Sequence, residues 1–95
     1  MALTDPLTRR HLRVRGRVQG VGFRWFARET AASLGLAGWV RNREDGTVEA
    51  EAEGRAAALD EFVRRLRGGC PGARVDSIEQ RPAAPHGGDG FDIRR

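Results

Sequence analysis

The chain has 95 residues, enough for one small domain that folds alone, and its net charge is +4, with 17 basic and 13 acidic residues. All of the basic residues are arginine, and because acidic residues are interleaved with them, no basic block predicts a nucleic-acid partner. No apolar run approaches the ~20 residues of a membrane span, and the start of the chain lacks the apolar core of a signal peptide.

The first third of the chain is predicted to form an arm, a strand and a helix. Residues 1–9 have no periodicity, so we expect a flexible N-terminal arm before a single domain at residues 10–95. Apolar residues and arginines alternate over residues 11–18, which predicts a strand with one apolar face. One face of an amphipathic helix follows, ending before Gly35, and is made of Phe23, Phe26, Ala27, Thr30, Ala31 and Leu34.

The rest of the chain adds further strands and a second helix. They are a strand at residues 38–43, a hairpin turn at Asp45-Gly46, a strand at 47–53, a helix at 55–67, a strand at 73–81, a Pro/Gly-rich loop at 82–90 and a short edge strand at 91–94. The spacing of Val75 and Ile78 does not fit a regular strand, so we expect a bulge or an irregular register there.

Charge on the strands predicts their order in the sheet. The outer faces of the first two strands carry arginine, whereas the third presents Glu49, Glu51 and Glu53. Placing the third strand between the other two sets each glutamate opposite an arginine, and a right-handed crossover allows this order. The predicted fold is therefore α+β, a ferredoxin-like split βαβ sandwich (βαββαβ plus a short C-terminal strand), with two helices on one face of an antiparallel sheet. We expect the Arg/Glu ladder on the open face to be structural, with each exposed pair worth at most ~1 kcal/mol.

The turn between the first strand and the first helix is rich in glycine. Such a turn directs unpaired backbone N–H groups and the positive end of the helix dipole toward one point, which attracts anions. Arg24 lies in the first helical turn, where the dipole disfavours a cation unless a bound anion offsets it, and a guanidinium suits phosphate. We therefore expect a phosphate cradle, although the glycines alone are also compatible with a tight connection. The absence of lysine excludes a P-loop, and Trp25 stands where a dinucleotide fingerprint needs its third glycine.

A second candidate is Asn42, which shares a strand face with Val40 and so points toward the helices. A buried amide is costly without partners, but an asparagine just before a hairpin also has a purely structural explanation. We expect His11, His86 and Cys70 to be bystanders. Cys70 is the only cysteine, which excludes an internal disulfide and fits a cytoplasmic location.

The chain resembles the acylphosphatase family over residues 10–94, nearly its whole length. The resemblance rests on three blocks, which read Gly16-Arg17-Val18-Gln19-Gly20-Val21-Gly22-Phe23-Arg24, Gly38-Trp39-Val40-Arg41-Asn42 and Asp45-Gly46-Thr47-Val48-Glu49. It implies a hydrolase of carboxyl–phosphate bonds that needs no metal or other cofactor. By the same resemblance Arg24 binds the phosphate and Asn42 positions the attacking water, while the backbone forms the cradle at Gln19, Gly20, Val21, Gly22 and Phe23. The implied substrate is a small acyl phosphate, the product is inorganic phosphate, and a monomer without nucleic-acid or membrane partners is expected.

The chemistry agrees with this assignment. Acyl phosphates release a carboxylate with a pKa near ~4–5, so the leaving group needs no general acid. In-line phosphoryl transfer mainly requires positioning and charge stabilisation, which one arginine, several N–H donors and one amide supply.

Two other functions are compatible with parts of this sequence pattern. Ferredoxin-like sheets also bind RNA through aromatic side chains on the open face, but only Trp39 is aromatic there. An acylphosphatase-like domain also begins larger carbamoyl-transferring maturation enzymes, and because this chain ends at Arg95, the free-standing enzyme is expected.

Overall fold

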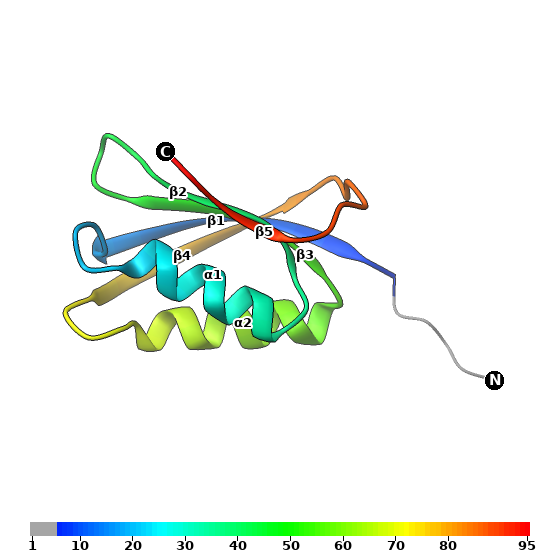
Figure 1. The fold of residues 1–95 in the computed structure, drawn as a ribbon, viewed down its shortest axis with the longest axis horizontal. Helices are drawn as coiled ribbons and strands as arrows, with labels where there is room; N and C mark the ends of the chain where they lie inside the picture. Colours follow the sequence, from blue (N-terminus) through cyan, green and yellow to red (C-terminus); the bar gives the residue numbers. More distant parts are fainter. Residues whose placement is uncertain (1–5) are drawn as a thin grey trace.

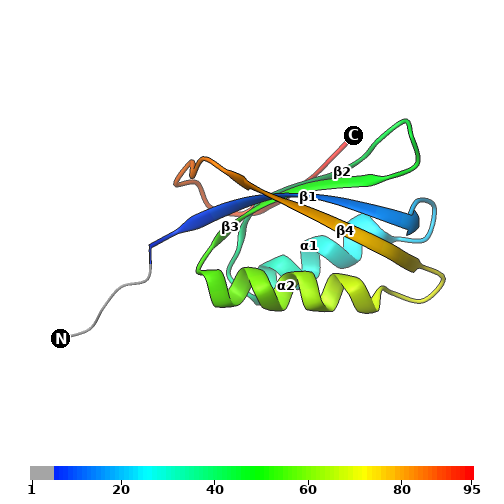
Figure 2. The ribbon, with the colours of Figure 1, turned by 180° about the vertical axis from the view of Figure 1, so that it is seen from behind.

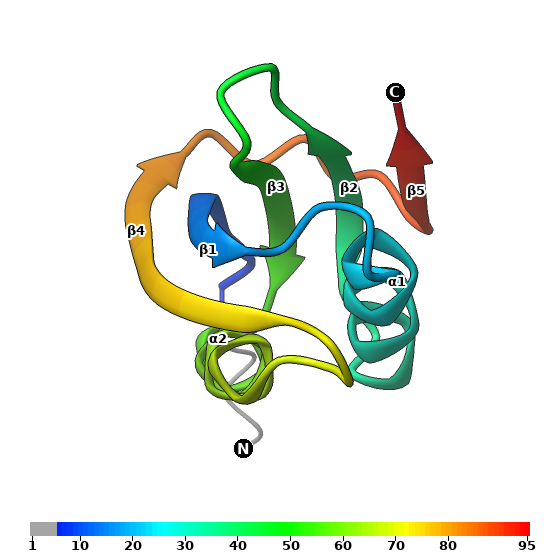
Figure 3. The ribbon, with the colours of Figure 1, turned by 90° about the vertical axis from the view of Figure 1, so that its left-hand side faces the viewer.

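The computed structural model describes residues 6–95, in which five strands and two helices alternate along the chain. They are β1 (Thr8–Arg17), α1 (Phe23–Ser33), β2 (Ala37–Asn42), β3 (Val48–Gly54), α2 (Ala56–Gly68), β4 (Arg74–Ala83) and β5 (Phe91–Arg94). The strands form one sheet in the order β4-β1-β3-β2-β5. Both helices lie on the same side of this sheet, as the two opposite views show (Figure 1, Figure 2). The view along the sheet separates the two layers most clearly (Figure 3).

The predicted strand order is confirmed, because β3 lies between β1 and β2. Glu49 stands opposite Arg13 on one side and Arg41 on the other, as the charge pattern predicted. The expectation that each glutamate faces an arginine is wrong for Glu51, which stands opposite His11 and Trp39. The prediction of a purely antiparallel sheet is wrong, since β5 pairs with β2 in parallel. The loop after β4 carries the chain back along the sheet, so β5 enters at the same end as β2 and the sheet is mixed (Figure 1).

The expected arm at residues 1–9 overlaps the first strand. Residues 1–5 lie outside the part that the structure describes, while Thr8 and Arg9 already belong to β1. Arg9 is buried, and its guanidinium Nε lies 2.6 Å from Glu51 Oε1. Alternation failed to extend the strand this far because the position on the face of Leu12 and Val14 is Arg10, which pairs with Asp60 of α2 instead of contributing an apolar side chain.

The odd spacing of Val75 and Ile78 does mark a bulge. Arg15 pairs with Ser77 and Gly16 pairs with Val75, so Asp76 has no partner and the register shifts. Gly16 permits this close approach, because a Cβ there would lie 2.1 Å from the Arg74 carbonyl oxygen and its φ is +133°.

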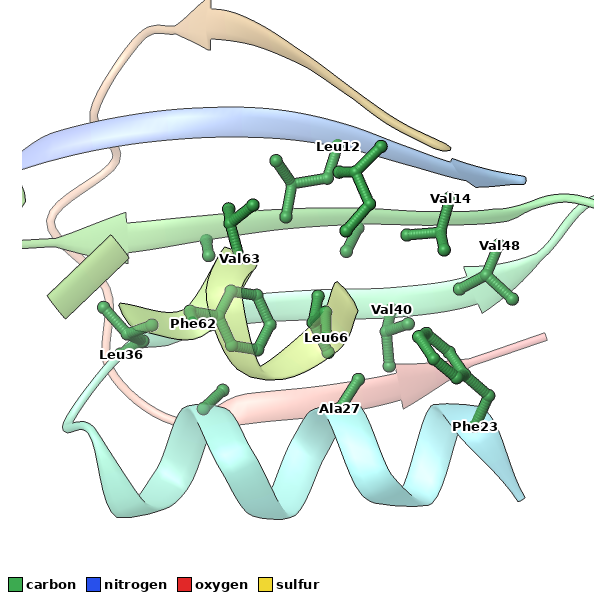
Figure 4. Close-up of a cluster of buried hydrophobic side chains, with 14 of the residues drawn as sticks. Leu12, Val14, Phe23, Ala27, Leu36, Val40, Val48, Phe62, Val63 and Leu66 are labelled. Atoms are coloured by element: carbon green, nitrogen blue, oxygen red, sulfur yellow. The ribbon is translucent and has the colours of Figure 1, made fainter. Parts of the chain in front are cut away.

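The core lies between the sheet and the two helices (Figure 4). Leu12, Val14, Val40 and Val48 project from the strands toward the helices, and all are fully buried. From the other side the helices contribute Phe23, Ala27, Phe62, Val63 and Leu66. Burial of this one apolar face on each element holds the layers together and fixes where β1 and β2 end relative to α1. Neither helix in residues 6–95 has the length and apolar character needed to cross a bilayer.

The open face of the sheet is more enclosed than predicted. Glu49 is only 7% exposed, and it meets His11 Nε2 at 2.5 Å and Arg41 Nε at 2.7 Å. Burial raises the pKa of Glu49, but the hydrogen bonds from His11 and Arg41 outweigh it and lower the pKa to about 2. The ladder is therefore a half-buried network, and His11 is a member of it rather than a bystander.

The loop after β4 is attached to the same face. The Glu53 carboxylate accepts backbone N–H groups of His86 at 2.6 Å and Gly87 at 2.8 Å, and Arg9 Nη1 lies 3.3 Å away. These contacts, with the backbone hydrogen bond of His86 contributing most, lower the pKa of Glu53. The loop that leads into β5 is thus held down by a buried carboxylate on β3.

Candidate active site

The loop between β1 and α1 has the conformation that the glycine pattern predicts. Gly20 and Gly22 both adopt left-handed backbone angles, with φ of +74° and +78°, and Gly22 caps α1. A Cβ at either position would meet nothing within 4 Å, so it is the backbone angle, and not crowding, that favours glycine here.

The start of α1 carries several unsatisfied donors. No side chain caps the helix, and its first turn has no acidic residue. Within residues 6–95, the N–H groups from Gly20 to Trp25 donate to no backbone or side-chain acceptor. These N–H groups and the helix dipole make the loop a site for an anion.

The Gln19 side chain attaches this loop to the neighbouring hairpin. Its amide Nε2 donates to the carbonyl oxygens of Arg43 at 2.6 Å and Thr47 at 2.9 Å. The side chain therefore fixes the distance between the loop and the end of β2. The Val21 carbonyl is turned the other way, where it accepts the Cys70 thiol at 3.7 Å.

Arg24 and Asn42, which the sequence places far apart, line the same cavity. This cavity has a volume of about 190 Å³, and its lining residues are Val18, Gly20, Gly22, Phe23, Arg24, Trp25, Asn42 and Ile93. Ligand pockets for drug-sized molecules have volumes of about 300–1,000 Å³, so this one suits a smaller ligand. Among the expected site residues, Gln19 and Val21 do not line it.

The two polar side chains of the cavity differ in their hydrogen bonding. Arg24 Nη1 donates to the Arg94 carbonyl oxygen at 3.0 Å, which ties the guanidinium to β5. Asn42 Oδ1 is buried and has no hydrogen-bond partner in the described part of the chain. A buried acceptor without a hydrogen-bond partner costs about 1–3 kcal/mol, so such an acceptor is typical of a site where a ligand or a water molecule donates to it.

Trp25 and Ile93 are lining residues that the sequence did not single out. Trp25 follows Arg24 directly, but a helical pattern does not tell which of two adjacent residues faces a neighbouring cavity. Ile93 reaches the site only because β5 pairs in parallel with β2, which sets Ile93 beside Val40. Had the last strand been predicted to pair in parallel with β2, Ile93 would have been among the expected lining residues.

A larger cavity of about 560 Å³ lies beside the first and shares Asn42 with it. Its other lining residues are Arg41, Arg43, Glu44, Asp45 and Arg95. Arg41 and Arg43 are already paired with Glu49, and Asp45 Oδ1 accepts the backbone N–H and the hydroxyl of Thr47. This second cavity is therefore charged, but several of its charges have partners.

The fold and the smaller cavity together define a small α+β protein with a compact cavity at an uncapped helix N-terminus. The acylphosphatase family model matches residues 10–93. An acylphosphatase from Azoarcus sp. (strain BH72) is 51% identical over 93 residues, which cover 95% of this chain and 95% of that one. The crystal structure of acylphosphatase from Bacillus subtilis has a TM-score of 0.90 and 42% identity, covering 93% of this chain and 99% of that chain. The chain therefore belongs to the acylphosphatase family, whose activity is the hydrolysis of acyl phosphates.

The same domain also occurs inside larger proteins. The crystal structure of T. kodakarensis HypF matches 93% of this chain with a TM-score of 0.80 and 38% identity, but the match covers only 12% of that protein.

Proposed function

We propose that this protein hydrolyses small acyl phosphates to a carboxylate and inorganic phosphate, with Arg24 binding the phosphoryl group and Asn42 orienting the attacking water. The observation that carries the proposal is that Arg24, Asn42 and the unpaired loop N–H groups surround one small cavity.

The phosphoryl oxygens fit the loop side of this cavity. The N–H groups of Gly20, Val21, Gly22 and Phe23 are free to donate to them, and the helix dipole stabilises their negative charge. Arg24 keeps further N–H donors beyond the one it gives to Arg94, so it can bind two phosphoryl oxygens at once. These donors also stabilise the charge on the equatorial oxygens of the transition state.

Asn42 is suited to hold the attacking water. Its unpartnered Oδ1 can accept a hydrogen bond from a water molecule at the end of β2. The water oxygen then forms a bond to phosphorus as the bond to the carboxylate oxygen breaks. The carboxylate leaves with the bonding electrons, and a phosphoryl oxygen takes the proton of the water. No strong base is required, because a phosphoryl oxygen accepts this proton, and no general acid is required, because the leaving carboxylate is a weak base.

The remaining parts of the proposal follow from this chemistry. Arginine and N–H donors supply the positive charge that a metal ion would otherwise supply, so we infer metal-independent hydrolysis. The cavity lining supplies the guanidinium, the amide and the N–H donors that the reaction needs, so we propose an active monomer that needs neither nucleic acid nor a membrane. We propose a cytoplasmic location because the lone thiol of Cys70 suits a reducing compartment.

The test is hydrolysis of benzoyl phosphate in EDTA by the wild type and by Arg24→Ala. Wild type is expected to be active, and Arg24→Ala to lose about 10³-fold in kcat/KM, because the charge-assisted hydrogen bonds of the guanidinium to the phosphoryl oxygens are lost. Arg64→Ala, which removes an exposed arginine on α2, is the matched control and should keep full activity. An inactive wild type, or an Arg24→Ala variant as active as Arg64→Ala, would refute the proposal.

A further inference from the structure

One large apolar side chain at the cavity is left open to solvent. Trp25 is 58% exposed, although it lies in the first turn of α1 and lines the same cavity as Arg24 and Asn42. A single exposed tryptophan on a protein surface needs no explanation by itself. Beside the proposed phosphate site, however, the Trp25 ring offers an apolar surface, which a phosphoryl group cannot use and an apolar acyl group can.

The lining of the cavity is divided by chemistry. Gly20, Gly22, Arg24 and Asn42 provide its hydrogen-bonding groups, whereas the ring of Trp25 and the side chain of Ile93 are apolar. Val18 and Phe23 also line the cavity, but they are fully buried and belong to the core. A ligand with a charged end and an apolar end matches this division.

Both apolar side chains are held in place. The Arg28 guanidinium carbon lies 3.9 Å from the centroid of the Trp25 ring, so a cation–π contact three residues along the helix fixes the ring. Ile93 is half-buried, packs against the core and lies opposite Val40 in the β2–β5 pair. A preorganised apolar surface binds a ligand without the cost of ordering it first.

We propose that Trp25 and Ile93 form the subsite for the acyl group, so that the enzyme prefers acyl phosphates with an aromatic or large apolar acyl group over acetyl phosphate. The inference rests on the proposed function, because the acyl group reaches this subsite only when its phosphoryl group occupies the loop. In-line displacement sets the leaving acyl group on the side of phosphorus away from the attacking water. The acyl group therefore points away from the attacking water, and Trp25 and Ile93 are the two apolar lining residues that are not fully buried and so can receive it.

The experiment compares benzoyl phosphate with acetyl phosphate on the wild type, Trp25→Ala and Trp25→Phe. We expect Trp25→Ala to raise KM for benzoyl phosphate about tenfold, with kcat for both substrates and KM for acetyl phosphate within about twofold of wild type. Trp25→Phe keeps an aromatic ring and should recover most of the lost affinity. Leu7→Ala removes the other exposed large apolar side chain of the described residues and should change neither kcat nor KM for either substrate.

The outcomes separate the two proposals. Equal losses on both substrates would show that Trp25 supports the fold of the loop and would overturn the acyl subsite, as would an unchanged KM for benzoyl phosphate. Either result leaves the proposed function standing, because acetyl phosphate is still hydrolysed by wild type. A wild type that hydrolyses neither substrate would refute the proposed function and the subsite with it.

Discussion

Replacement of Asn42 by alanine should separate activity from stability. In the folded protein Asn42 Oδ1 is buried without a partner, and such an acceptor costs about 1–3 kcal/mol. Alanine removes this cost but also removes some packing from a half-buried position, so we expect the free energy of unfolding to rise by up to about 1 kcal/mol. For a domain of this size that corresponds to a Tm between unchanged and about 4–8 °C higher. Turnover should fall about 10²–10³-fold, because the attacking water loses its orienting group.

The assay for this variant combines three measurements. Steady-state kinetics with benzoyl phosphate give kcat, thermal unfolding gives Tm, and the increase of Tm with added inorganic phosphate reports whether the cradle still binds. We expect the phosphate-dependent increase to persist, since Arg24 and the loop are intact. Gln80→Ala, which removes an exposed carboxamide on β4, is the control and should leave kcat unchanged. Wild-type turnover by Asn42→Ala, or a Tm below that of wild type, would refute this reasoning.

Three further predictions concern the cradle and the buried carboxylate. Inorganic phosphate at a hundred times its Kd should stabilise wild type by about 2.7 kcal/mol, and Arg24→Lys should lose this increase in Tm, because an ammonium does not match the geometry of the guanidinium fork. Gly22→Ala and Gly35→Ala both place a side chain at a left-handed angle (φ +78° and +69°) and should each cost about 1–2 kcal/mol, yet only Gly22→Ala should weaken phosphate binding, as titration calorimetry would show. Glu49→Gln should lower stability at pH 7 by about 1–3 kcal/mol. Because the pKa of Glu49 falls from 4.5 to about 2 on folding, its contribution is complete above pH 4.5 and is lost as the pH drops toward 2. Urea midpoints of the two proteins should therefore converge over that range, and a constant difference would contradict the prediction.

Local patterns predicted most of the fold, and charge predicted its topology. Alternation and helical spacing located all seven elements, and the row of glutamates on β3 favoured a place between β1 and β2, where Glu49 does meet an arginine on each side. The direction of β5 was not predictable in the same way, because a four-residue strand after a long loop carries no signal for parallel or antiparallel pairing. Because the direction of β5 was unknown, Ile93 was not included in the predicted site.

The burial of the glutamates on the open face could not be predicted from the sequence either. Glu49 and Glu53 alternate with alanine exactly as solvent-facing residues do, yet both are buried. Long arginine side chains cover Glu49, and the loop that reaches His86 and Gly87 covers Glu53. Alternation identifies which face a residue belongs to, but what lies over that face depends on segments distant along the chain.

For the candidate site, the sequence predicted that Arg24 and Asn42 meet and did not predict the surroundings of either. Their convergence follows from β2 ending beside the start of α1, which the strand order dictates. The side-chain role of Gln19 as a clamp on the hairpin, by contrast, depends on two carbonyl groups whose positions no local pattern specifies.

The position of β1 between β4 and β3 has a consequence for how the protein is made. Arg9 pairs with Glu53 on one side and Ala83 on the other, so this inner strand is synthesised before the other elements of the domain and receives its second neighbour only once residue 83 has been made. Closing such long loops is costly in entropy and is repaid only when β4 docks. We therefore expect a nascent chain to remain unfolded on the ribosome until residue 83 has emerged, and the released chain to fold more slowly than a helical bundle of the same length.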